Sequence, residues 1–408
     1  MDSEAIITLE NDYTANTYAR YDVALTEGKG ARARDQEGRE YIDFTSGIGV
    51  NSLGFCEPGW VEAVQKQAGA LQHVSNLYYT EPCAKAAEKL VKLTGMSSAF
   101  FSNSGAEANE GAIKAARKYS FLKYGQDDRD LKNAQDARGR FGRYRIVTLT
   151  GSFHGRTMAT VTATGQRGFH KYFTPFLQGF GYAKTNDVGS LYNKVTENTC
   201  AIMIEFIQGE GGVIELDRGF VDAIAEICKK RDILLIADEV QTGIGRTGRF
   251  MAYEHFGVKP DIVTVAKGLG GGLPIGAAVF GEKTNGALEP GDHGSTFGGN
   301  PVVCAGAGYV LSRFEDGGAF LKEITEKGDY FREKLEALPG VKGVSGRGLM
   351  IGVDVGEKDA KAVVAEALKR GLMTLTAKDK VRFLPPLVIG KEDIDEGLSI
   401  FAEALGAV

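Results

Sequence analysis

The 408-residue chain contains few of the residues that build disulfide frameworks or metal sites. Its cysteines are few, odd in number and far apart, with no Cys-x-x-Cys pair; they are Cys56, Cys83, Cys200, Cys228 and Cys304. Its five histidines show no metal-ligand spacing. The pattern argues against a disulfide-stapled secreted protein and against a zinc site. We therefore expect a chain kept reduced in the cytoplasm, with no metal.

Long apolar runs and basic blocks are also missing. No apolar run approaches the ~20 residues that span a bilayer, and the N-terminal stretch MDSEAIITLE is acidic where a targeting peptide would be basic. The formal net charge is -5, without a block of five or six basic residues. We expect a soluble protein that works on small molecules and has neither nucleic acid nor a membrane as partner.

Short apolar runs alternate with helix-period segments such as GFVDAIAEICKKRD from about residue 83 onward. The runs are AFFSN, YRIVTLT, CAIMIEFI, ILLIADEV, DIVTVAKG and AAVFG. Runs that are apolar on both faces are typical of strands buried in a mostly parallel sheet. The sequence therefore predicts an α/β fold in which helices cover both sides of the sheet.

The two ends of the chain have a different pattern. RARDQEGREYIDFTSG alternates and turns at Glu37-Gly38, which predicts a hairpin. A helical region at about 302–338, the stretch GVKGVSGRGLMIGVDV, a helix near 359–370 and VRFLPPL follow the central region. We predict that residues 1–60 and 301–408 form a smaller α+β domain and residues 61–300 a large ligand-binding domain. Residues 126–143 are highly charged, and we expect a solvated surface insertion there.

Two strand ends carry ionisable residues. ILLIADEVQTG ends in Asp238 and Glu239, which face opposite ways, so only one of them can point at a ligand in the crevice where α/β folds bind ligands. Lys267 ends the next apolar run and is followed by glycines. Burial there would lower the pKa of its amine and favour a neutral nucleophile suited to Schiff-base formation. Taken singly, an acid at such a strand end can be only a helix cap, and a lysine there can be only a surface residue.

A third strand end suggests a phosphate site. In FFSNSGAEANEGAIKAARK, backbone N–H groups of Ser104, Gly105 and Ala106 would lie at a helix N-terminus, which favours a bound phosphate. A capped helix without a ligand would look the same. Together, an amine that forms Schiff bases, an acid that keeps a pyridine nitrogen cationic and a phosphate cradle indicate pyridoxal 5'-phosphate.

Five motifs occur in a fixed order: SNSGAEANE, GSFHGRT, ADEVQTGIGRTG, AKGLGGGLPIGA and HGSTFGGNP. In these motifs the chain resembles the class III (ornithine/4-aminobutyrate type) aminotransferases, from about Asn16 to Leu387. Asp238 and Lys267 are 267 - 238 = 29 positions apart, similar to the spacing in that family. The resemblance implies a fold-type-I pyridoxal-phosphate transferase that forms a homodimer with shared active sites.

Roles in cofactor binding follow from the resemblance position by position. Lys267 is similar to the lysine that carries the cofactor, and Asp238 to the partner of its ring nitrogen. Phe153 resembles the residue that stacks on the ring, and Gln241 the partner of the ring hydroxyl. The remaining cofactor-binding candidates are Ser104, Gly105, Ala106, Glu239, Val240 and Thr296, of which Thr296 would reach the phosphate from the neighbouring subunit. Ser295, supplied from the same neighbouring subunit, is a substrate-binding candidate.

Substrate-binding candidates also follow from the resemblance. Arg156 resembles a clamp for a substrate carboxylate, and Arg382, in VRFLPPL, the arginine that grips the α-carboxylate of the 2-oxo acid. Glu210 is similar to an acid that pairs with this second arginine when the bound amine donor has no carboxylate at that end. A glycine-rich loop can also hold such an acid for structural reasons.

The segments NTYAR, GIGVNSLG and HVSNLYYTEP resemble family members that transfer the amino group of N-acetylornithine to 2-oxoglutarate in arginine biosynthesis, with ping-pong kinetics. Phe55-Cys56-Glu57-Pro58 departs from the histidine-cysteine-histidine-proline that we expect there. Succinylornithine, N-acetyllysine, ornithine and 4-aminobutyrate stay open as donors, as does an aminomutase reaction. A non-catalytic binding or regulatory protein and an oxidoreductase are more distant alternatives, and the chain lacks a dinucleotide fingerprint.

Overall fold

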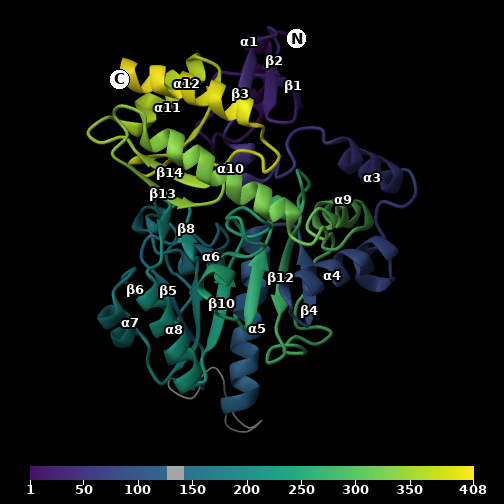
Figure 1. Cartoon of the computed structure of the whole chain (residues 1–408). Coiled ribbons are helices and arrows are strands. Elements are labelled where there is room, and N and C mark those ends of the chain that lie inside the picture. Colours follow the sequence, from purple (N-terminus) through teal and green to yellow (C-terminus); the bar gives the residue numbers. More distant parts are fainter. Residues whose placement is uncertain (126–141) are drawn as a thin grey trace.

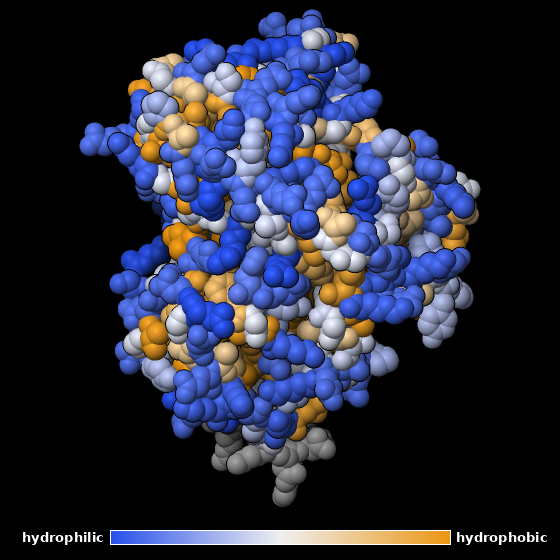
Figure 2. All heavy atoms as spheres, viewed as in Figure 1, coloured by the Kyte–Doolittle hydropathy of each residue, from blue (hydrophilic) through white to orange (hydrophobic). Residues whose placement is uncertain are grey.

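The computed structural model describes residues 1–125 and 142–408 (Figure 1). The predicted surface insertion at 126–143 lies outside these residues except for its last two positions. In the described part of the chain, no helix is long and apolar enough to cross a membrane. Most of the face drawn in Figure 2 is hydrophilic, with apolar side chains confined to smaller areas between the charged ones.

A seven-stranded sheet forms the centre of the lower part of the molecule in Figure 1, in the order β4-β12-β11-β10-β7-β5-β6. Its strands are β4 (Ser98–Ser102), β5 (Arg145–Leu149), β6 (Phe180–Ala183), β7 (Thr199–Ile204), β10 (Leu234–Asp238), β11 (Ile262–Val265) and β12 (Gly276–Phe280). β12 runs antiparallel to both of its neighbours, and the other pairs are parallel. The predicted mostly parallel sheet is confirmed.

Helices cover both faces of this sheet, as its apolar runs predict. In β7, Ile202 and Ile204 join the apolar cluster that contains helix α8 (Arg218–Arg231). Met203, between them, joins the cluster that contains helix α5 (Gly105–Tyr124). Because neighbouring side chains of a strand point to opposite faces, each run must be apolar throughout to fill both layers.

Three further helices pack together beside the sheet. α9 (Pro301–Ser312) contacts both α3 (Pro58–Ala68) and α4 (Glu81–Thr94). The predicted helical region at 302–338 is in fact two helices, α9 and α10 (Ala319–Glu336), separated by a turn in which Gly317 and Gly318 both have positive φ. Glycine adopts this left-handed backbone without a steric penalty.

Both ends of the chain meet in the upper part of the molecule in Figure 1. One sheet joins β1 (Leu25–Lys29), β2 (Arg32–Asp35) and β3 (Glu40–Asp43) to β15 (Leu372–Met373). A second contains β13 (Gly343–Arg347), β14 (Met350–Asp354), β17 (Lys380–Phe383) and β16 (Leu375–Ala377). α11 (Ala360–Lys369) and α12 (Lys391–Ala407) pack on these strands with α10.

This upper part is held together by apolar contacts between segments far apart in sequence. The rings of Phe44, Phe331, Phe383 and Phe401 are buried in contact with one another, with centroids 5.0–5.5 Å apart. β2 and β3 pair antiparallel around residues 36–39, so the hairpin at Glu37-Gly38 is confirmed. The domain limits 1–60, 61–300 and 301–408 stay a prediction.

Short elements complete the architecture. They are α1 (Ser3–Tyr13), α2 (Ser46–Gly49), α6 (Met158–Ala163), α7 (Val188–Lys194), β8 (Ile207–Gln208) and β9 (Ile214–Glu215), with 3-10 turns at Ser75–Leu77, Arg167–His170, Ala252–Phe256 and Lys267–Leu269. The last of these turns begins at Lys267, directly after β11.

Candidate active site

A pocket of about 450 Å³ lies where β10 and β11 end and α5 begins. We call it the strand-end pocket. Its lining includes predicted residues from distant parts of the chain: Ser104, Gly105, Ala106, Phe153, Arg156, Asp238, Val240, Gln241 and Lys267. The fold therefore brings together the three strand ends that the sequence singles out.

The two adjacent acids at the end of β10 face opposite sides of the sheet. Asp238 lines the pocket, whereas the Glu239 carboxylate accepts hydrogen bonds from the Ala252 N–H at 3.0 Å and the Tyr253 N–H at 2.9 Å. Burial raises the pKa of Glu239 to about 7, although these hydrogen bonds act in the opposite direction. The prediction that Glu239 contributes to cofactor binding must be corrected for its side chain, because strand alternation points that side chain away from the pocket.

Asp238 is held by Val240, a predicted site residue, and by His154 and Asn109, which were not predicted to belong to the site. Its Oδ2 lies 2.7 Å from Nδ1 of His154 and accepts a hydrogen bond from the Asn109 amide at 2.8 Å. Its Oδ1 accepts from the Val240 N–H at 3.1 Å. His154 lies within the GSFHGRT motif but was given no role there; it is buried and orients the central carboxylate.

A second buried acid, Glu205, also lines the pocket and was missed. It accepts hydrogen bonds from the Phe153 N–H at 2.9 Å and from the Gly209 N–H at 3.3 Å. Burial raises its pKa to about 7. The sequence signal was present, because Glu205 directly follows the apolar strand β7 just as Asp238 ends β10.

Lys267 has the surroundings that a nucleophilic amine requires. Burial lowers the pKa of its amine, and Arg382 lowers it further, while Glu210 and Asp238 act in the opposite direction. Within residues 1–125 and 142–408, no side chain or backbone group hydrogen-bonds this amine. Its φ is +43°, a strained value for a residue with a side chain, of the kind that clusters at active sites.

The N-terminus of α5 opens into the same pocket. Ser104 caps the helix, and its hydroxyl accepts from the Glu107 N–H at 3.2 Å. The N–H groups of Gly105 and Ala106 come first in the helix, so they have no intrahelical partner. A Cβ at position 105 would lie 2.6 Å from the Val240 side chain, so glycine is needed for this close approach.

A buried arginine and an acid form an ion pair beside Lys267. Arg382 Nη1 lies 2.6 Å from Glu210 Oε1 and donates to the Gln241 side-chain oxygen at 3.1 Å. Arg382 is only 2% exposed. Burial alone would raise the pKa of Glu210, but Arg382, together with Lys267 and Gln241, holds that pKa below its ordinary value.

The other predicted arginine, Arg156, lies at the exposed edge of the pocket. Its guanidinium carbon is 4.2 Å from the centre of the Phe169 ring and 5.6 Å from that of Phe153. Such stacking holds the guanidinium plane without using its donors. In the part of the chain that is described, no carboxylate pairs with Arg156, so its donors are available to a ligand.

Ser295 and Thr296 do not line the strand-end pocket of their own chain. The Ser295 hydroxyl accepts from the side-chain amide of Asn103, a pocket residue, at 3.0 Å, and Thr296 is exposed. Their predicted role from a neighbouring subunit stays a prediction. As to metals, the described residues contain no group of acids, histidines and cysteines that could hold an ion.

Comparison with known proteins agrees with this geometry. A model of the family described as aminotransferase class III matches residues 13–405. The chain belongs to the class III aminotransferases. It is therefore a pyridoxal-phosphate-dependent aminotransferase, as predicted.

Two curated relatives match this class III aminotransferase over nearly their whole length. The acetylornithine aminotransferase of Haemophilus ducreyi is 50% identical, and the match covers 99% of each chain. That of Caldanaerobacter subterraneus subsp. tengcongensis is 48% identical, and the match covers 99% of this chain and 100% of the relative. Among solved structures, the ornithine aminotransferase of Toxoplasma gondii has a TM-score of 0.90 at 31% identity, covering 100% of this chain and 96% of the other. The N-acetylornithine aminotransferase of Stenotrophomonas maltophilia has a TM-score of 0.80 at 35% identity, and the match covers 98% of each chain. The fold-type prediction is confirmed.

The strand-end pocket of this aminotransferase fits pyridoxal phosphate. It combines free helix N-terminal donors, a buried carboxylate held by three hydrogen-bonding groups, and an amine without a partner in the described residues. These are the groups needed by a phosphate, a cationic pyridine nitrogen and an aldehyde.

Proposed function

We propose that this aminotransferase transfers the terminal amino group of N-acetylornithine to 2-oxoglutarate, giving N-acetylglutamate 5-semialdehyde and glutamate, in arginine biosynthesis. The two relatives at 48–50% identity carry the name of this activity. The structural observation that supports it is the pair of arginines: Arg382 is bound to Glu210, whereas Arg156 has no ion pair with any residue of the described ranges.

Bound pyridoxal phosphate supplies an aldehyde that takes up and returns the amino group, and a ring that withdraws electrons from the reacting carbon. Gly105 and Ala106 would hold its phosphate with their N–H groups, and Phe153 would pack against its ring. Gln241 would bind the ring hydroxyl. Asp238 would keep the ring nitrogen protonated, with His154 and Asn109 holding its carboxylate in place.

Lys267 would bind the cofactor and then act as the base of the reaction. Its neutral amine can accept the proton from the substrate carbon and return it, since a lowered pKa brings the amine closer to the working pH. Glu210 and Asp238 limit this lowering, so the amine keeps enough basicity to remove a proton.

The arginines would distinguish the two substrates. N-acetylornithine reacts at an end without a carboxylate, so the Glu210–Arg382 ion pair can stay closed while Arg156 binds the carboxylate at the far end. 2-Oxoglutarate brings a carboxylate next to its reacting carbon, and Arg382 would then bind it in place of Glu210.

Spectral titration of the holoenzyme with single amine donors tests the donor. We expect N-acetylornithine to bleach the visible cofactor band faster, and at lower concentration, than succinylornithine, ornithine, N-acetyllysine or 4-aminobutyrate. If another donor bleaches the band fastest, N-acetylornithine is not the preferred donor, although the enzyme is still an aminotransferase. A holoenzyme without a visible band would overturn Lys267 as the cofactor lysine.

A matched pair of donors tests Arg156. N-acetyl-1,4-diaminobutane is N-acetylornithine without its carboxylate. Arg156→Gln should weaken the binding of N-acetylornithine about tenfold or more, because the charge-assisted hydrogen bonds to its carboxylate are lost. The binding of N-acetyl-1,4-diaminobutane should stay unchanged. An equal loss for both donors would show that Arg156 does not bind the carboxylate.

We also propose a homodimer with shared sites. Large apolar side chains are exposed next to the segment that carries Ser295 and Thr296: Leu77 is 81% exposed, Tyr78 71% and Phe297 62%. Asn76 bonds the Ser295 carbonyl oxygen at 3.0 Å, so the two segments lie side by side. An apolar surface beside half of a predicted phosphate site fits burial by a second copy.

Subunit mixing tests this sharing. Lys267→Ala and Thr296→Glu chains should each form inactive dimers. A mixed dimer has one intact site if Thr296 serves the neighbouring subunit, so random mixing should recover roughly a quarter of wild-type activity. No recovery would place Thr296 at the site of its own chain.

The cytoplasm stays our proposal for the location of the enzyme, since all five cysteines are free thiols.

A further inference from the structure

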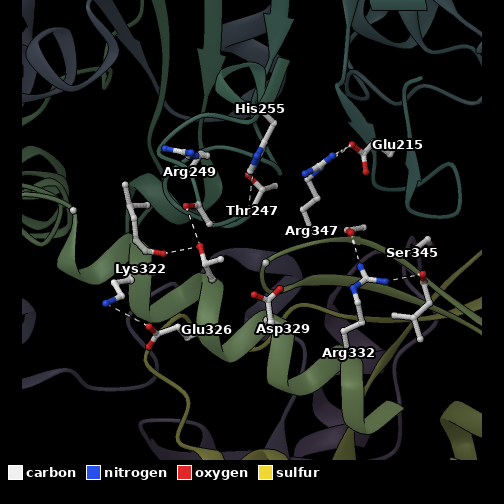
Figure 3. Close-up of a pocket in the computed structure, with 18 residues that line it drawn as sticks. Glu215, Thr247, Arg249, His255, Lys322, Glu326, Asp329, Arg332, Ser345 and Arg347 are labelled. Carbon is white, nitrogen blue, oxygen red and sulfur yellow. Dashed lines mark hydrogen bonds and ion pairs between the residues drawn. The ribbon is translucent and has the colours of Figure 1, made fainter. Parts of the chain in front are cut away.

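A second, larger cavity of about 990 Å³ lies between α10 and the loop that precedes the 3-10 turn Ala252–Phe256. We call it the α10 cavity. Figure 3 shows Asp329 and Arg332 on the side of the helix that faces Arg249 and His255, with Lys322 and Glu326 at its lower edge. Arg347, at the tip of the β13–β14 hairpin, lies at one end. It shares no lining residue with the strand-end pocket.

The walls of this cavity are fixed by backbone contacts. A Cβ at Gly328 would lie 2.5 Å from the Gly348 carbonyl oxygen, so α10 packs directly against the hairpin. Arg332 donates to the carbonyl oxygens of Val344 and Gly346, and the Leu349 N–H donates to the Arg246 carbonyl oxygen at 3.0 Å. The cavity is therefore already formed between three packed segments.

One corner of the cavity is cationic. Nε and Nη2 of Arg347 each lie 2.7 Å from Oε1 of Glu215, so Nη1 does not take part in this ion pair. Arg249 has no hydrogen bond or ion pair with any described residue. Burial, together with the charges of Arg347 and Arg249, lowers the pKa of His255 to about 4, so this ring is neutral near pH 7. A carboxylate would be attracted to this corner.

The opposite wall carries an acid without a partner. Lys322 pairs with Glu326 at 3.7 Å, whereas Asp329 has no hydrogen bond or ion pair with any described residue. Figure 3 shows its carboxylate on the side of α10 that faces the cavity, between Glu326 and Arg332. Once the internal pairs are formed, the cavity therefore presents a free guanidinium on one wall and a free carboxylate on the other.

We infer that the α10 cavity binds a small zwitterion, an amino or guanidino carboxylic acid whose carboxylate lies against Arg249 and whose cationic group lies against Asp329. The volume is within the range that encloses small organic ligands. A plain anion would leave Asp329 unpaired and would face its repulsion. The inference is independent of the donor used at the strand-end pocket.

Calorimetric titration of the holoenzyme with 4-guanidinobutanoate tests this site. This probe has both charged ends but no primary amine, so it cannot enter transamination. We expect saturable binding, with a Kd at or below about 1 mM. Arg249→Gln and Asp329→Asn should each weaken it about tenfold. Arg218→Gln and Asp222→Asn, which break an exposed ion pair on α8, are matched controls and should leave it unchanged.

Three outcomes would overturn the inference. The first is the absence of saturable binding. The second is binding that neither cavity substitution alters, which would place the probe outside the α10 cavity. The third is binding of butanoate as tight as that of 4-guanidinobutanoate and insensitive to Asp329→Asn, which would make the site a simple anion site. Both cavity substitutions are at exposed positions, so thermal unfolding should match the wild type in each case.

Discussion

The strand-end pocket and the α10 cavity are lined by the same kinds of charged residues but differ in how those residues are held. Arg382 is 2% exposed and bound to Glu210 and Gln241, whereas Arg249 is exposed and has no partner in the described residues. Charges removed from water need fixed partners, and such partners pre-organise a site for chemistry. Exposed charges interact weakly through water and suit reversible binding. Substitutions should therefore have large catalytic effects in the first site and small ones in the second.

The largest contrast should come from the two lysines. Lys267→Ala removes the amine that binds the cofactor and moves the proton, so kcat should fall at least about 10³-fold. Lys322→Ala removes an exposed lysine of the α10 cavity and should leave kcat unchanged. Steady-state assays with saturating cofactor measure both. A Lys267→Ala enzyme that keeps a tenth of wild-type activity would contradict the assignment.

The adjacent acids Asp238 and Glu239 should separate catalysis from stability. Asp238→Asn keeps the shape but removes the charge in the pocket, and kcat should fall about 10²-fold. Glu239→Gln should leave kcat nearly unchanged but lower the free energy of unfolding by about 1–3 kcal/mol, because its amide cannot satisfy all the buried donors of the carboxylate. Steady-state kinetics and urea unfolding of both variants measure these effects. If Asp238→Asn and Glu239→Gln lowered kcat and stability equally, the assignment of one acid to catalysis and the other to stability would be wrong.

Two acids that pair with arginines provide the next test. Glu210→Gln leaves Arg382 with an uncompensated buried charge, so the half-reaction with the amine donor should slow about tenfold, while that with 2-oxoglutarate changes little. Glu215→Gln breaks the exposed pair with Arg347 at the α10 cavity and should change neither. Stopped-flow spectra of each half-reaction give both rates. Equal slowing of the two half-reactions by Glu210→Gln would refute the proposed switch.

The smallest effect should be a pH dependence of stability. Glu239 has a pKa of about 7 in the folded protein, above its ordinary value of 4.5, so the folded state binds the proton more tightly than the unfolded state. Its contribution to stability is present at low pH and is lost as pH rises from about 4.5 to about 7. The free energy of unfolding of the wild type, relative to Glu239→Gln, should therefore fall on the order of 1 kcal/mol between pH 5 and 7. A rise over that interval would show the opposite sign.

The central sheet could be read from the sequence because each strand is apolar on both faces. Strands of this kind need helices on both sides, and β7 shows the two layers in its alternating residues. The split between α9 and α10 was not predicted, although Gly317-Gly318, the pair with positive φ at the turn, is a typical turn signal. Strand pairings between the two ends of the chain, such as β3 with β15, could not be predicted from local pattern.

At the site, the residues predicted to touch the cofactor were found, but the residues that hold them in place were not, even where those residues lie inside a motif, as Asn109 and His154 do. Asn109 lies on the first turns of α5 and Glu205 directly after β7, and neither position is unusual by itself. Their importance comes from contact with Asp238 and with the Phe153 segment, across long sequence separations.

The sequence by itself determined the sheet, the three strand ends with their amine, acid and helix N-terminus, and the alternation that allows only one of Asp238 and Glu239 into the site. Only the tertiary structure decided which residues hold Asp238, which backbone groups bind the Glu239 carboxylate, and that Arg249 and Asp329 share a cavity. The reason is physical: local pattern follows from backbone geometry and apolar periodicity, whereas the partner of a charge depends on which distant segments pack together.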